Sequence, residues 1–224
     1  MAAPQSAQHI MRRCGAVLLA AGAVDITWMV WRISTGSDYS YSMALPAILG
    51  GALLLRGSLR AAFFLAWIAS VLLPIAVASG VIALLQPLDL TLTQIRLDPA
   101  GQIAGALPLV LFCVVLYWLR SELQQLPVQS AFLTAGRRKP AVHVALGIGV
   151  VFALLALAGQ QLGRDAGFSE TAVSLAREKH GAGFHYYASK ITPRREAEGT
   201  SVAATVQAWR ADRVAVVDVS WKEK

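Results

Sequence analysis

Charged residues are scarce in this chain. They make up 15% of its 224 residues, whereas hydrophobic residues make up 56%. Soluble domains carry about 25% charged residues, and the mean hydropathy of +0.54 points in the same direction. The scarcity of charge therefore excludes an ordinary soluble domain and predicts a membrane protein with several spans.

Cysteine is also scarce, and the familiar catalytic motifs are missing. The two cysteines, Cys14 and Cys113, lie in or beside apolar runs, and residues 164–224 contain none. A disulfide framework in the C-terminal part is therefore excluded, even in an oxidising compartment. The sequence has no glycine-rich phosphate loop, no CxxC pair and no HExxH motif. We expect no catalytic residue, no cofactor and no bound metal, and therefore no enzyme.

The net charge of +7 is concentrated in the first part of the chain. Up to Gly163 there are ten Lys and Arg against five Asp and Glu, a net charge of +5, and the remaining residues add +2. Basic residues interleaved with aromatic ones, which would indicate a nucleic-acid surface, do not occur. We therefore exclude nucleic acid as a partner and interpret the basic residues as a signal of membrane topology.

Five apolar runs predict a bundle of five membrane spans over residues 1–163. They cover residues 14–33, 43–55, 61–85, 103–119 and 141–162. The last run has 22 residues, which at ~1.5 Å per residue exceeds the ~30 Å of hydrocarbon that a helix must cross. The first run is too long for the apolar part of a signal peptide and carries Asp25, so we predict an uncleaved span. The second run is the shortest and contains Pro46.

The basic residues predict the orientation of these spans. If all five runs cross, one side receives eight Lys and Arg and the other receives only Arg32 and Arg96; the eight are Arg12, Arg13, Arg56, Arg60, Arg120, Arg137, Arg138 and Lys139. Cytoplasmic loops carry the excess of Lys and Arg. We therefore predict a cytoplasmic N-terminus and a periplasmic C-terminus in a bacterial inner (cytoplasmic) membrane.

The connections between the runs differ in character. Residues 34–42 form a short polar loop, and residues 120–140 form a polar connector with four basic residues and one acidic residue, Glu122. Between the third and fourth runs, Leu88, Leu92 and Ile95 have the spacing of one helix face, which favours a short interfacial helix. Leucine also alternates at positions 88, 90 and 92, so a strand remains an alternative.

Residues 164–224 are predicted to form one small α+β domain. Ser169 is a good N-cap for a helix from Glu170 to His180, with a glycine directly after its end. Three runs with alternating apolar residues predict strands over residues 183–191, 201–209 and 213–221. We interpret 210–213 as a hairpin turn and 192–200 as a solvated loop. About 60 residues make a marginal domain, so we expect it to dock on the membrane part or on a partner.

Three polar residues of the membrane part are candidate functional residues. An ionisable group inside a span costs roughly 2.5–3.5 kcal/mol on insertion scales, which makes Asp25 either functional or fixed by packing against a neighbouring helix. The expected spans place no cation at its depth, so we predict a neutral Asp25 that is hydrogen-bonded to Ser70. His143 lies near the cytoplasmic end of the last span. In the C-terminal domain, His180 and His185 lack a third ligand for a metal.

Two stretches carry a resemblance to a known family. Residues 53–62 (LLLRGSLRAA) and 84–97 (LLQPLDLTLTQIRL) are similar to a family of uncharacterised bacterial inner-membrane proteins. The resemblance covers the membrane half of the chain and extends to the strand FHYYASKI. It implies the membrane topology described above, and it implies no activity.

Two hypotheses of function follow from these observations. In the first, the protein is a non-enzymatic accessory or scaffold whose bundle anchors a small periplasmic interaction domain. Its partners are then the lipid bilayer and either another protein or further copies of the same chain. In the second, the protein is a subunit of a small-solute or ion transporter that uses Asp25.

Overall fold

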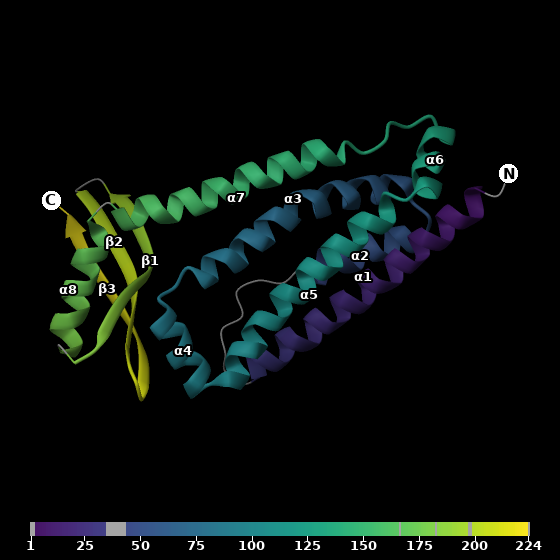
Figure 1. Ribbon diagram of the computed structural model, residues 1–224. Helices are drawn as coiled ribbons and strands as arrows, with labels where there is room; N and C mark the ends of the chain where they lie inside the picture. The colour runs from purple at the N-terminus through teal and green to yellow at the C-terminus, as the bar shows by residue number, and fades with distance from the viewer. Residues whose placement is uncertain (1–2, 35–43, 166, 182, 197–198, 224) are drawn as a thin grey trace. The chain divides into compact units, whose positions relative to one another are not determined.

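The computed structural model describes residues 3–34, 44–165, 167–181, 183–196 and 199–223 (Figure 1). Within these residues, the helices are α1 (Ala3–Ser34), α2 (Ala44–Leu55), α3 (Leu59–Leu84), α4 (Leu88–Leu97), α5 (Pro99–Leu123), α6 (Leu126–Thr134), α7 (Val142–Asp165) and α8 (Phe168–His180). The strands are β1 (His185–Glu196), β2 (Gly199–Arg210) and β3 (Arg213–Glu223). The chain divides into two compact units, the first formed by Met1–Pro74 and Phe112–Val150, and the second by Ile75–Leu111 and Val151–Lys224.

Four of the described helices are long and apolar enough to cross a membrane, which is typical of membrane proteins. These candidate segments are Gln5–Ser34, Leu59–Leu84, Pro99–Leu123 and Val142–Gly159. They confirm four of the five predicted apolar runs as long helices. The remaining run, residues 43–55, is not confirmed as a span, because α2 has only 12 residues. At ~1.5 Å per residue that is about 18 Å, well below the thickness of the hydrocarbon.

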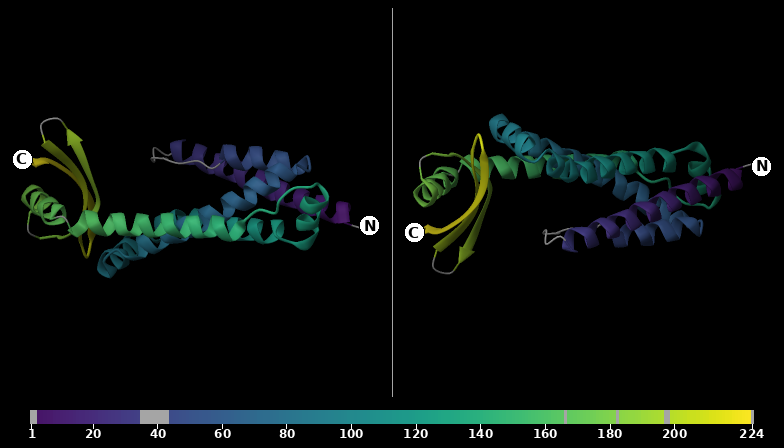
Figure 2. Two further views of the ribbon diagram at one scale, coloured as in Figure 1. Left: turned by 90° about the horizontal axis from the view of Figure 1, so that it is seen from above. Right: turned by 90° about the horizontal axis from the view of Figure 1, so that it is seen from below.

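Helices α1 and α2 form an antiparallel hairpin in the first unit (Figures 1 and 2). A Cβ built on Gly15 would lie 2.7 Å from the carbonyl oxygen of Gly51, and one on Gly51 would lie 2.8 Å from that of Gly15. Gly57, with φ of +73°, ends α2. Its amide donates to Leu54 and the next amide to Leu53, as in a Schellman motif. Most of the predicted polar loop, residues 35–42, lies outside the described residues.

The core of the first unit gathers segments that are far apart in the sequence. It combines the start of α1, the end of α2, the first part of α3, the end of α5 and one face of α6. Cys14, Leu54, Leu123 and Phe132 are almost completely buried there. Because van der Waals contact and small side chains drive helix association in membranes, the alanines of α3 suit this close packing.

Helix α6 was not predicted, because residues 120–140 were interpreted as a polar connector. Val128 and Phe132 are buried on one face of α6, and the ring of Phe132 meets that of Phe63 edge to face at 6.3 Å. Gly136 has φ of +66°, and the amide of Arg137 donates to the carbonyl of Phe132 at 2.9 Å. This second Schellman motif ends α6 and leads directly into the basic triplet Arg137 to Lys139.

The second unit contains the C-terminal sheet and helix α4. The strands are antiparallel in the order β1-β2-β3. One face of the sheet packs on α8 (Figure 1), with a core that includes Ala172, Val206 and Val217. The predicted alternation of apolar residues in the three strands is therefore confirmed. Trp221 is only partly buried against this core, so a full burial of its ring is not observed.

Helix α4 lies against strands β2 and β3 in the same unit. Gln207 faces away from α8, because it alternates with the core residues Val206 and Ala208. The side-chain amide of Gln94 on α4 donates a hydrogen bond of 3.0 Å to the side-chain oxygen of Gln207. Leu90 is completely buried, whereas Leu88 is 75% exposed. The predicted amphipathic helix is thus confirmed over the strand alternative, and the expected docking of the C-terminal domain takes place on α4.

Two boundaries predicted in the C-terminal domain are wrong. Helix α8 begins at Phe168 after Gly167, whose φ of +74° makes the turn, so Ser169 is not the N-cap. Strands β1 and β2 continue through most of the predicted loop 192–200, with Pro193 paired to Val202. Proline is tolerated there because β1 is an edge strand. The predicted turn is confirmed, since Arg210 pairs with Arg213.

Candidate functional site

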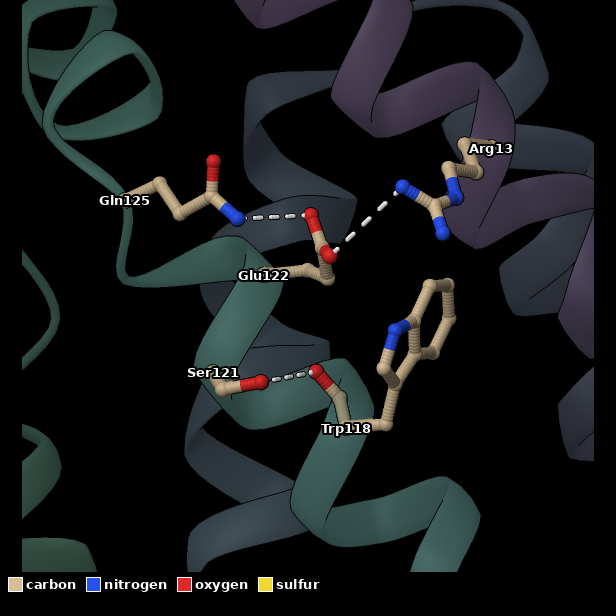
Figure 3. A network of polar contacts seen from close by, with 5 residues as sticks. All are labelled: Arg13, Trp118, Ser121, Glu122 and Gln125. Carbon is tan, nitrogen blue, oxygen red and sulfur yellow. Dashed lines mark hydrogen bonds and ion pairs between the residues drawn. The ribbon is translucent and has the colours of Figure 1, made fainter.

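A polar network joins α1 to α5 in the first unit (Figure 3). Arg13 lies in the first third of α1. The last turns of α5 contribute Trp118, Ser121 and Glu122. Gln125 is the residue that precedes α6. Leu119 and Leu123 belong to the core. Glu122 lies three residues after Leu119, so its side chain points to the neighbouring side of α5, where it meets Arg13.

Glu122 is the centre of this network. Its carboxylate accepts a hydrogen bond of 2.8 Å from the side-chain amide of Gln125. It also faces the guanidinium of Arg13 at 3.9 Å, and the side chain of Glu122 is only 14% exposed. The same guanidinium lies 5.6 Å from the ring centroid of Trp118. Because Arg13 is 61% exposed, we assign the ion pair at most about 1 kcal/mol.

The chemistry available to this network is that of a structural contact. Glu122 is the only carboxylate it contains, and the hydroxyl of Ser121 donates to the carbonyl of Trp118 at 2.7 Å. Across the described residues, no group of three or more His, Cys, Asp and Glu side chains could hold a metal ion. The network therefore holds the start of α1 against the end of α5 and offers no acid–base pair.

Asp25 lies on α1 and is half-buried. One turn earlier, Gly22 contacts α2: a Cβ built on it would lie 2.7 Å from Ile48 and 3.2 Å from the carbonyl oxygen of Ala44. Residues three apart share a helix face. Asp25 is therefore placed on the side of α1 that faces the beginning of α2.

Ser70 and His143 occupy two further positions in the first unit. Ser70 is completely buried on α3, and its hydroxyl donates to the carbonyl of Ala66 at 2.7 Å. The predicted hydrogen bond to Asp25 is thus replaced by one within the same helix, which a serine in a helix forms readily. His143 is exposed at the beginning of α7. The three candidates do not form one site.

The polar side chains of the C-terminal domain make local contacts. His185 stacks on the buried ring of Trp209 with the ring centroids 5.6 Å apart. In the turn between β2 and β3, the guanidinium of Arg210 binds the carboxylate of Asp212 through two hydrogen bonds of 2.6 and 2.9 Å. The hydrogen bonds from Arg210 hold the pKa of the Asp212 carboxyl below its usual value. The contact fixes the turn.

The contact between Arg13 and Glu122 was not predicted from the sequence, although a signal was present. Glu122 is the only acidic residue between positions 112 and 150, and the predicted topology places it on the same side as Arg13. An isolated acidic residue among basic ones is a candidate for pairing, but the sequence alone does not say with which of the eight cations.

The chain was also compared with known proteins. No family model, no curated protein and no solved structure gives a significant match, so the resemblance to a family of bacterial inner-membrane proteins stays a prediction.

Proposed function

We propose that the chain is an integral protein of the bacterial inner membrane that anchors a small periplasmic interaction domain and acts as a non-enzymatic accessory or scaffold. The observation that carries this proposal is the position of the sheet on α4, made through Gln94 and Gln207. Helix α4 connects α3 and α5, two of the helices long enough to cross a membrane. A protein bound to the sheet would therefore be held at the membrane surface.

The arrangement of the first unit supports a cytoplasmic N-terminus. All eight residues of the larger basic set lie in segments that flank its core, beside residues such as Met11, Leu54, Leu123 and Phe132. The cations that the sequence assigns to one side thus belong to segments that meet at the same core, which supports a common side for them. Such an excess of Lys and Arg is typical of the cytoplasmic side.

The hairpin of α1 and α2 supports five crossings in spite of the short α2. Helix α1 leads away from the basic end, and α2 runs back beside it until Leu54 packs on the same core as Met11 and Cys14. The end of α2 therefore lies beside the part of the chain at which α1 begins. Five crossings place the N-terminus and the C-terminal domain on opposite sides.

We further propose that strand β3 provides the surface for an extended segment of a partner protein. Strands β1 and β3 are the two edges of the sheet. The register of β1 shifts between Ala188 and Lys190, and Pro193 removes a backbone donor. The pairing of β3 is continuous over its whole length. Bulges and prolines protect sheet edges from strand addition, so β3 is the edge better suited to bind an added strand.

Photo-crosslinking in intact cells tests this function. A photoreactive residue at Val216 of β3, which is 65% exposed, is expected to give one discrete adduct. The same residue at Lys190, exposed on β1, is the matched control and should give none. An adduct with a second copy would identify the partner as the chain itself. Absence of adducts from both positions would refute an interaction domain.

Reporter fusions test the orientation separately. A reporter of cytoplasmic or periplasmic location after Lys139 and one after Lys224 should give opposite signals. Equal signals would mean that the chain crosses an even number of times between them. The alternative of a transporter subunit that uses Asp25 stays a prediction, and solute uptake abolished by Asp25→Ala would favour it.

A further inference from the structure

A shallow groove of about 460 Å³ lies along α6 in the first unit. It is lined by Ser6, Leu126, Pro127, Gln129, Ser130, Leu133 and Lys139. The hydroxyl of Ser130 donates to the carbonyl of Pro127, and the amide of Gln129 donates to that of Gln124. Lys139 carries the only charged side chain among these lining residues.

The apolar part of the groove belongs to the outer face of α6. Leu126 is 80% exposed and Leu133 is 59% exposed. They are seven residues apart and so share one helix face. The opposite face holds Val128 and Phe132 in the core. Helix α6 is thus anchored by one face and presents two leucines beside a cation on the other, a combination that suits an amphipathic ligand.

The charge beside the groove is strongly positive. Arg137, Arg138 and Lys139 follow the turn at Gly136, and all three are exposed. The only acidic side chain between positions 112 and 150 is Glu122, which is already paired with Arg13. The one carboxylate of this segment is therefore already paired with a cation, and its repulsion of an anion bound near the triplet is reduced.

The place of the groove in the chain points to the membrane boundary. Helix α6 begins three residues after the end of α5 and ends eight residues before the start of α7, and both of those helices are long enough to cross a membrane. Basic pockets beside membrane helices on the cytoplasmic side bind the head groups of anionic lipids. A short amphipathic helix at that depth contacts the acyl boundary with its apolar face.

We propose that this groove binds one anionic phospholipid, with the phosphate of the head group at Lys139 and the upper acyl chains along Leu126 and Leu133. Arg137 and Arg138 add attraction without lining the groove. The ligand is a lipid and not a free phosphate ester, because the two exposed leucines would gain nothing from a small anion. The site is independent of the partner surface proposed on β3.

The test uses the full-length protein, delipidated in a mild detergent and titrated with phosphatidylglycerol or phosphatidylethanolamine. Native mass spectrometry counts the lipids retained. We expect one phosphatidylglycerol to bind at a concentration at which phosphatidylethanolamine does not. The groove variant combines three changes, namely Arg137→Gln, Arg138→Gln and Lys139→Gln. Since each cation near an anionic surface contributes roughly fivefold in affinity, the loss should be at least about tenfold.

The matched control removes three other exposed cations of the same unit. It combines Arg12→Gln, Arg56→Gln and Arg60→Gln, which lie outside the groove, and it should bind phosphatidylglycerol within about twofold of the unchanged protein. Equal loss in both variants would overturn the site, because binding would then follow total charge. Circular dichroism of the lipid-free proteins verifies that both variants fold.

A second variant and a competitor separate the lipid from its head group. Leu133→Ser keeps every cation and is expected to weaken phosphatidylglycerol binding by several-fold. Glycerol phosphate at millimolar concentration should not displace the lipid. Unchanged binding in Leu133→Ser together with displacement by glycerol phosphate would overturn the proposal in favour of a simple anion site.

Discussion

Gly15 and Gly51 let the backbones of α1 and α2 approach each other closely, and replacing either with alanine tests the hairpin. A Cβ at position 15 would lie 2.7 Å from the carbonyl oxygen of Gly51 and 3.0 Å from the amide nitrogen of Leu55. These are backbone atoms, which cannot move aside by a change of rotamer. The helices would have to separate, and overpacking of this kind costs about 1–3 kcal/mol.

The expected loss of stability has to be corrected for an opposite effect of alanine. Alanine is a better helix former than glycine by up to about 1 kcal/mol. Gly105 on α5 provides the reference, because a Cβ built there meets nothing within 4 Å. We therefore expect Gly105→Ala to be neutral or stabilising. Gly15→Ala and Gly51→Ala should each be less stable than Gly105→Ala by about 1–3 kcal/mol.

The assay is reversible unfolding in mixed micelles, followed by circular dichroism. The double variant provides a further check, since both methyl groups force apart the same pair of helices. Its cost should be smaller than the sum of the two single costs, as for residues that share one contact. If Gly15→Ala and Gly105→Ala change the free energy of unfolding equally, the close approach of α1 and α2 is refuted.

Three further predictions concern single side chains. Trp209→Ala should lower the stability of the C-terminal domain by about 3–5 kcal/mol, because its ring is buried. Trp221→Ala should lower it by about 1–3 kcal/mol, because its ring is only partly buried. Protease digestion of the full chain should therefore cleave the Trp209→Ala variant faster than the Trp221→Ala variant. Asp25→Asn should keep the melting temperature in detergent, whereas Asp25→Ala should cost roughly 0.6–2 kcal/mol, and equal losses would mean that the charge itself is needed. Because Arg210 lowers the pKa of Asp212, the contribution of this pair to stability is present above the usual pKa of 3.8 and is lost as the pH falls through the lowered value. Hydrogen exchange of the β2–β3 turn should therefore become faster at low pH. Asp212→Asn should abolish this pH dependence.

The long elements of this fold could be predicted from the sequence, because their signals are periodic and local. The four long apolar runs became helices, and alternation in the C-terminal domain gave all three strands with the correct inner faces. Helix α6 was missed because nine residues carry little periodic signal. The ends of β1 and β2 were missed because Arg194, Arg195 and Glu196 are typical of loops, although an edge strand accepts them equally well.

The candidate sites could be predicted less well, because they depend on contacts between segments that are distant in the sequence. Ser70 was paired with Asp25 from its expected depth in the membrane, but depth along a helix does not fix the direction of a side chain. The carbonyl of Ala66, one turn away, is always within reach of that hydroxyl and takes its hydrogen bond. The pair of Arg13 and Glu122 depends on the packing of α1 on α5.

The packing of α1 on α2 bears on the surroundings of Asp25, which lies within an apolar run. Asp25 follows Gly22 by one turn, on the helix side that contacts Ala44 at the start of α2. The first backbone amides of any helix have no carbonyl partner within that helix, and their dipoles favour an acceptor. The start of α2 therefore brings backbone donors beside the stretch of α1 that carries Asp25. An acceptor oxygen is what such donors require, and asparagine supplies one as well as aspartate does. This is the physical reason why we expect Asn, and not Ala, to replace Asp25.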